Sequence, residues 1–149
     1  MNLTSLNEVL KFAVRKEADA AAFYRMAADR SNPGVKKAFE ELAKEEDGHK
    51  KRLETLDLKK MEQAEVKETR GLGLTETFVD IPFRSDMSYA ELLRMAMKNE
   101  EASRALYSSA AQAVSEPGLK KILLALAQEE SHHKEKLEKM YDKDVLQEF

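Results

Sequence analysis

"EEDGHK" at residues 45–50 and "EESHHK" at residues 129–134 carry one pattern twice, a glutamate followed three residues later by a histidine. Around them, the first half of the chain matches the second at an offset of 83 residues, which becomes 84 after an extra residue near Glu116. A period this long exceeds the roughly 20–50 residues of solenoid repeats. The sequence therefore predicts two copies of one helical hairpin.

Capping and turn signals divide each copy into two helices. Ser5 and Ser88 each precede a glutamate by three residues, the capping-box spacing that opens a helix. Prolines in "SNPG" (31–34) and "SEPG" (115–118) end one helix and open the next. We expect helices at about 6–31, 34–66, 88–115 and 118–142, forming hairpins 5–66 and 88–142 that a crossover at about 67–87 joins. This pattern is typical of an all-α four-helix bundle, a single domain over residues 1–149.

Composition narrows the class of protein. Of the 149 residues 42% are hydrophobic and 36% charged, and the net charge of −3 indicates no binding to nucleic acid or to an anionic membrane. No apolar run approaches the roughly 20 residues that cross a bilayer, and the N-terminus lacks the regions of a signal peptide. Because cysteine is absent, Cys-ligated zinc and iron–sulfur sites are excluded within this chain. We expect a soluble, cytoplasmic protein.

Each expected helix carries an apolar stripe that polar residues interrupt near its middle. On the first helix the stripe runs in steps of three and four residues and includes Leu10, Ala13, Glu17, Tyr24 and Ala27. Such a stripe faces the core of a bundle. Across the four helices the glutamates and histidines on these stripes are Glu17, Glu46, His49, Glu100, Glu130 and His133.

Four buried carboxylates at one level would repel one another strongly, and no lysine or arginine lies on the stripes to neutralise them. Two divalent cations would balance the four negative charges, and two neutral imidazoles would complete the ligation. Carboxylate together with imidazole suits iron or manganese. The six residues are therefore predicted to bind two metal ions, and no catalytic side chain beyond them is predicted.

Glu129 and His132 have the same spacing and offer a competing register. Their counterparts in the first copy are Glu45 and Gly48, and glycine has no side chain with which to bind a metal. Repeat symmetry therefore favours the neighbouring pair and leaves His132 as a solvated or rim residue. Gly48, which costs about 1 kcal/mol relative to alanine inside a helix, either permits close backbone approach or is a tolerated surface glycine.

Tyr24 and Tyr107 lie on the stripes, each seven residues after a predicted ligand. Two interpretations remain open for both. Each tyrosine either fills the core, or its hydroxyl hydrogen-bonds a ligating carboxylate and orients it.

At these residues the chain resembles the ferritin-like di-iron superfamily, particularly rubrerythrin and its relatives, over roughly residues 5–56 and 88–140. The resemblance implies two iron ions, with manganese as an alternative, held by the six residues. Ser103 departs from the pattern, because rubrerythrin has an additional glutamate there, and the cysteines of a rubredoxin domain are absent. Haem is not implied, since Asp47 stands where bacterioferritin has its haem-binding methionine.

The resemblance implies an oxidoreductase that oxidises iron(II) with peroxide or O₂, in oxidative-stress defence or iron handling. Its partners would be a separate electron-donor protein and further copies of the chain, in a homodimer or larger oligomer. Four alternatives remain: an iron-storage protein, a structural bundle that uses metal only to fold, a manganese catalase-like enzyme and a small-molecule oxygenase.

Overall fold

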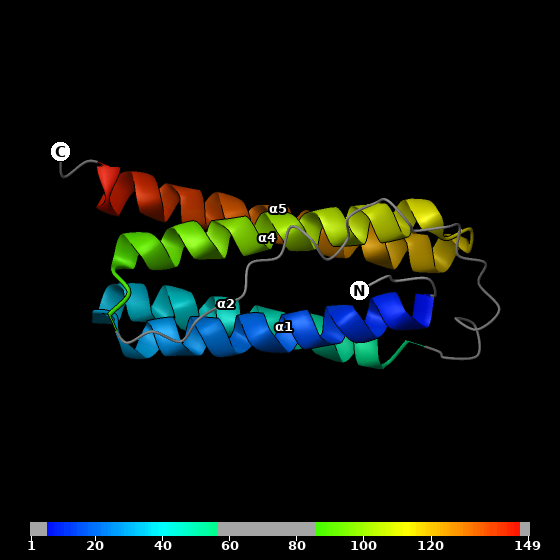
Figure 1. Cartoon of the computed structure of the whole chain (residues 1–149), viewed down its shortest axis with the longest axis horizontal. Coiled ribbons are helices and arrows are strands. Elements are labelled where there is room, and N and C mark those ends of the chain that lie inside the picture. Colours follow the sequence, from blue (N-terminus) through cyan, green and yellow to red (C-terminus); the bar gives the residue numbers. More distant parts are fainter. Residues whose placement is uncertain (1–5, 57–85, 147–149) are drawn as a thin grey trace.

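The computed structural model describes residues 6–56 and 86–146. Its helices there are α1 (Leu6–Asp29), α2 (Pro33–Glu54), α4 (Tyr89–Ala113) and α5 (Pro117–Asp144). Helix α1 packs along α2, α4 packs along α5, and the two hairpins lie side by side (Figure 1). Between the hairpins, the backbones of α1 and α4 come close at more positions than those of α2 and α5. The predicted all-α four-helix bundle is confirmed.

Local signals in the sequence account for the helix starts. Pro33 and Pro117 occupy the first turns of α2 and α5, where a missing N–H costs nothing. The side chain of Asn32 accepts a hydrogen bond from the Val35 amide at 3.1 Å. Ser88 Oγ accepts one from the Glu91 amide at 3.1 Å, as its place in the capping box predicts. Ser5, the equivalent residue of the first copy, lies outside the described residues.

The end of α2 differs from the prediction. The helix was expected to continue to residue 66, but it ends at Glu54. The Thr55 amide still bonds Lys51 O four residues back, whereas the Leu56 amide bonds Leu53 O only three residues back, so the last turn tightens. No glycine or proline occurs near this point, and nothing local marks the end. Residues 57–66 and nearly all of the predicted crossover lie outside the described residues.

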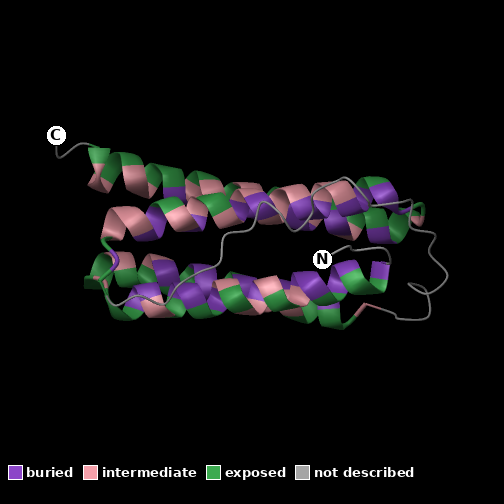
Figure 2. Cartoon of the chain, in the orientation of Figure 1, coloured by how far each residue is buried: buried purple, intermediate pink, exposed green. Residues whose placement is uncertain are grey.

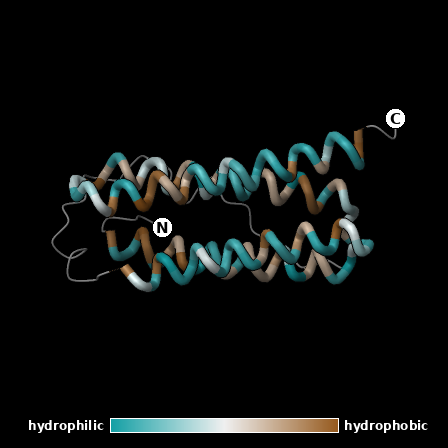
Figure 3. The backbone as a smooth tube through the Cα atoms, turned by 180° about the vertical axis from the view of Figure 1, so that it is seen from behind, coloured by the Kyte–Doolittle hydropathy of each residue, from teal (hydrophilic) through white to brown (hydrophobic). Residues whose placement is uncertain are grey.

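The hydrophobic core forms two clusters along the bundle. One contains Leu10, Leu106 and Leu126, and the other contains Phe39 and Leu93. The buried faces of the four helices turn toward one another (Figure 2), and apolar and polar residues alternate along each helix (Figure 3). Within the described ranges, no helix is long and apolar enough to span a membrane.

A polar layer separates the two clusters. Along α1, Ala13 belongs to the first cluster and Phe23 to the second, with Glu17 between them. In the part of the chain that the structure describes, the buried polar or charged residues, tyrosines aside, are Glu17, Glu46, His49, Glu100, Glu130 and His133. These are the six residues that interrupt the apolar stripes.

Candidate metal centre

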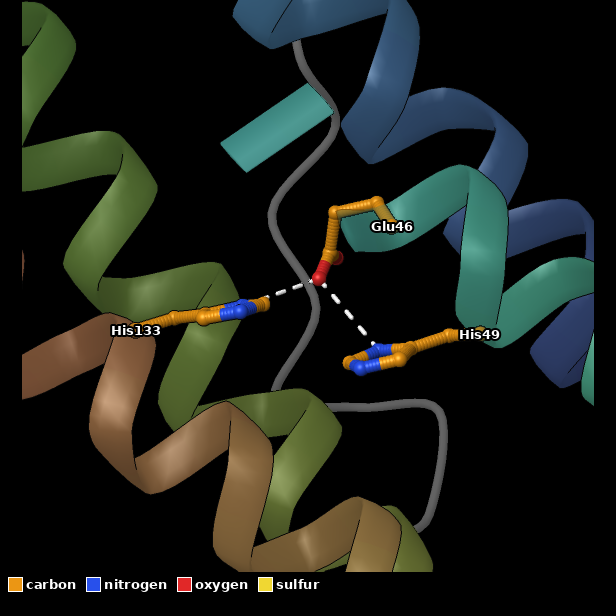
Figure 4. Close-up of side chains that lie close together, drawn as sticks. All are labelled: Glu46, His49 and His133. Carbon is orange, nitrogen blue, oxygen red and sulfur yellow. Dashed lines mark ion pairs between the residues drawn. The ribbon is translucent and has the colours of Figure 1, made fainter. Parts of the chain in front are cut away.

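The six side chains converge from all four helices on the middle of the bundle. Glu130 is 0% exposed, and His133, the most accessible of the six, is 6% exposed. The carboxylate of Glu46 on α2 points between the imidazole of His49 on the same helix and that of His133 on α5 (Figure 4). Glu46 Oε1 lies 3.4 Å from His49 Nδ1 and 2.9 Å from His133 Nδ1. Residues far apart in sequence thus present donor atoms to a common space.

The donor atoms form two overlapping groups of four. One group is Glu17, Glu46, His49 and Glu130, and the other is Glu46, Glu100, Glu130 and His133. Within each group, one ligand atom per residue lies within 4.8 Å of the others. Glu46 and Glu130 belong to both groups. The arrangement therefore brings two overlapping sets of metal-binding side chains together, and two carboxylates are common to both sets.

The hydrogen bonding of these groups tests whether metal ions fit. Among the described residues, the buried side-chain atoms without a hydrogen-bond partner are Glu17 Oε2, Glu46 Oε1, His49 Nδ1, Glu100 Oε2, both oxygens of Glu130 and His133 Nδ1. His49 Nδ1 lies 2.6 Å from Glu130 Oε1, but the contact lacks hydrogen-bond geometry. Buried polar atoms left unpaired are costly, and coordination by cations would satisfy all of these. The donor set therefore fits metal ions.

Without a cation, protons compensate part of the charge. Burial raises the pKa of Glu46 well above its usual value, and repulsion from Glu100 and Glu17 adds to the shift. The pKa of Glu130 is raised in the same way by burial and by Glu100 and Glu46. Burial disfavours protonation of His133, but its contacts with Glu100 and Glu46 outweigh this and raise its pKa to about 11. Metal ions would therefore have to displace protons from this centre.

Two buried tyrosines cross between the hairpins to the outer carboxylates. Tyr24 on α1 donates to Glu100 Oε1 on α4 at 2.5 Å, and Tyr107 on α4 donates to Glu17 Oε1 on α1 at 2.5 Å. Burial, followed by the charge of the accepting glutamate, raises the pKa of each tyrosine well above its usual value. Both hydroxyls therefore keep their protons and act as donors. Core packing and hydrogen bonding, which the sequence left as alternatives, occur together in each residue.

Comparison with known proteins places the chain in a family. The sequence matches the rubrerythrin family over residues 8–141. The chain belongs to the rubrerythrin family. No curated protein matches it significantly. Among solved structures, it is similar to that of a candidate ferritin-like diiron-carboxylate protein from Thermotoga maritima, with a TM-score of 0.81 and 24% sequence identity over 97% of this chain and 98% of that one. At that identity the likeness supports the fold alone.

Two further carboxylates of this rubrerythrin-family chain contact the outer edges of the imidazoles. Glu45 Oε2 lies 2.6 Å from His133 Nε2, and Glu129 Oε1 lies 3.8 Å from His49 Nε2. Each glutamate directly precedes a member of the four-donor groups on its helix and reaches the histidine of the other hairpin. The sequence reasoning missed this role, although the repeat places Glu45 opposite Glu129.

The residues of the competing register, Glu129 and His132, lie outside the converging set of donors. His132 is exposed, and it belongs to neither group of four donors. Glu129 is half-buried and forms an ion pair with Arg52 at 2.6 Å. Of the two Glu-x-x-His pairs on α5, the structure brings only the buried pair into the converging set.

Proposed function

We propose that this protein is a di-iron carboxylate oxidoreductase that oxidises iron(II) with peroxide or O₂. One observation carries the proposal: two buried groups of four carboxylate and imidazole donors share Glu46 and Glu130. Four carboxylates with two neutral imidazoles would balance two divalent ions, and this donor chemistry suits iron.

The surrounding residues support the donors in distinct ways. The hydroxyls of Tyr24 and Tyr107 hold the carboxylates of Glu100 and Glu17, each of which belongs to only one group. Glu45 lies at Nε2 of His133 and would hold a proton there, so that Nδ1 is left free to bind a metal. Partners of this kind fix the orientation and the tautomer of a ligand. The two apolar clusters on either side of the polar layer exclude water from it along the bundle axis.

When held by these residues, two iron(II) ions would supply two electrons, the number that peroxide needs, together with two protons, to become two molecules of water. O₂ needs four electrons for the same outcome. We therefore expect the reduced protein to react faster with peroxide than with O₂. Ser103 in place of a carboxylate should make this preference weaker than in rubrerythrins with the additional glutamate. Since the chain has no cysteine, repeated turnover should need a separate electron donor, but a single oxidation should not.

The residues of the centre can be tested by paired substitutions. Glu46→Ala combined with His49→Ala should abolish tight binding of at least one metal ion, because it removes donors from both groups of four. The control is Glu129→Ala with His132→Ala, which has the same spacing and composition but removes no member of either group of four. It should weaken metal binding far less, because Glu129 reaches only the outer edge of the His49 imidazole, at 3.8 Å. Isothermal titration of metal-free protein with iron(II) under anaerobic conditions measures both. Equal losses in the two double variants would show that the buried register is not the metal site.

The reaction can be tested by stopped-flow mixing of the reduced protein with peroxide or with O₂ at equal concentrations, followed by absorption. Peroxide should oxidise the centre faster. A faster reaction with O₂ would overturn the peroxidase-like part of the proposal and favour a ferroxidase or oxygenase.

A further inference from the structure

A pocket of about 460 Å³ lies between α2 and α5, on the outer side of the candidate centre. All three histidines of the chain line it, together with Glu45, Glu129 and Gly48. His49 and His133 are both buried and belong to different groups of four donors, so the pocket reaches both groups. Because His132 and Glu45 are exposed and Glu129 is half-buried, the same pocket also reaches the surface.

Gly48 leaves this pocket open. A Cβ atom built at Gly48 would meet nothing within 4 Å, so no neighbouring backbone requires a glycine there. Of the two alternatives that the sequence left open for Gly48, close backbone approach is therefore wrong. Its counterpart in the second copy is His132, which lines the same pocket with a full side chain. The repeat thus departs from symmetry at the position where one helix leaves space in front of the imidazoles.

The side chains that line the pocket are suited to pass divalent cations. Three imidazoles and two carboxylates are all groups that bind divalent metals. The cationic side chains beside them are paired: Arg52 Nη1 lies 2.6 Å from Glu129 Oε2, and Lys136 Nζ lies 3.3 Å from Glu41 Oε2. Along the bundle axis, in contrast, the apolar clusters flank the centre on both sides.

We infer that this pocket is the port through which divalent metal ions reach the centre, and that Gly48 keeps the port open. The inference rests on the proposed function, because it assumes that the six buried residues bind metal. It assigns to Gly48 a role in the rate of metal uptake and none in the final affinity.

Substitution of Gly48 tests the port. A leucine at this position would extend into the open space and slow metal uptake by about tenfold or more, which corresponds to about 1.4 kcal/mol of added barrier. Gly48→Ala adds a single carbon atom and should change the rate little. Lys51→Leu is the matched control, because it adds the same side chain to the same helix at an exposed position outside the pocket. Cobalt(II) is mixed with metal-free protein in a stopped-flow instrument, and its absorption bands report both the rate and the final amount bound.

The outcomes separate the port from the proposed function. Slow uptake by Gly48→Leu with the same final two cobalt ions per chain, and normal uptake by Lys51→Leu, would support the port. If the wild type binds two ions and Gly48→Leu takes them up equally fast, the port is wrong while the metal centre stands. If the wild type binds no cobalt or iron, the proposed function itself fails. Circular dichroism checks folding, and Gly48→Met replaces the leucine variant if that one does not fold.

Discussion

Replacing Tyr24 by phenylalanine removes one hydroxyl from the centre and leaves the ring packing in place. The lost contact is the 2.5 Å hydrogen bond to Glu100 Oε1. Glu100 belongs to only one of the two groups of four donors, the one that contains His133. The variant should therefore weaken one metal position more than the other.

The size of the effect follows from the environment of the carboxylate. Burial raises the pKa of Glu100, but contacts with Glu130, His133 and the Tyr24 hydroxyl together outweigh burial and lower it. Hydrogen bonds to charged groups contribute about 1.5–3 kcal/mol, and loss of a partner that orients a metal ligand costs about 10–100-fold in metal affinity. We expect Tyr24→Phe to weaken one metal position by roughly 10–100-fold.

The assay is competition for cobalt(II) between the protein and a chelator of known affinity, near pH 7. Tyr107→Phe should give a loss of similar size at the other position, because its hydroxyl donates to Glu17 at the same distance of 2.5 Å. The control is Tyr89→Phe. That hydroxyl lies 2.6 Å from Asp144 Oδ2, in a half-buried hydrogen bond to a carboxylate outside the two groups of donors.

The three tyrosine variants together test whether a tyrosine hydroxyl supports a metal ligand. A decrease in affinity for Tyr24→Phe no larger than that for Tyr89→Phe would refute the idea that the hydroxyl supports a ligand. A decrease in thermal stability alone, with unchanged affinity, would mean that Tyr24 acts only through packing and its own hydrogen bond.

Two further predictions concern stability. The metal-free protein should have a lower Tm near pH 8 than near pH 5, measured by circular dichroism, and the metal-loaded protein should change less. The raised pKa values of Glu46 and Glu130 and the pKa of about 11 for His133 mean that the folded metal-free chain binds more protons than the unfolded chain. Its stability therefore falls as pH rises above the ordinary values of 4.5 and 6.5; a metal-free Tm that rises with pH would contradict this. Asn32→Ala and Ser88→Ala should each cost about 1 kcal/mol in urea unfolding, because each removes a helix cap, and an unchanged midpoint would show that the cap contributes nothing.

The bundle could be predicted from sequence because its signals are local. The apolar stripes, the prolines at the first turns of α2 and α5 and the capping serine before α4 all act within a few residues of where they occur. The end of α2 at Glu54 could not be predicted, since the segment after it has helix-forming composition and carries no stop signal. Where such a helix ends depends on what it packs against.

The sequence by itself determined which polar side chains turn inward. Glu46 and His49 are three residues apart on one helix, so helical geometry alone places them on one face, and their position among apolar residues assigns that face to the core. The tertiary structure decided which residues of different helices meet. The sharing of Glu46 and Glu130 by both groups of donors depends on how the helices are rotated and shifted along one another. The same holds for the hydrogen bond from Tyr24 to Glu100 and for the open space at Gly48. Rotation and shift are set by the packing of many apolar side chains at once, and no short stretch of sequence records them.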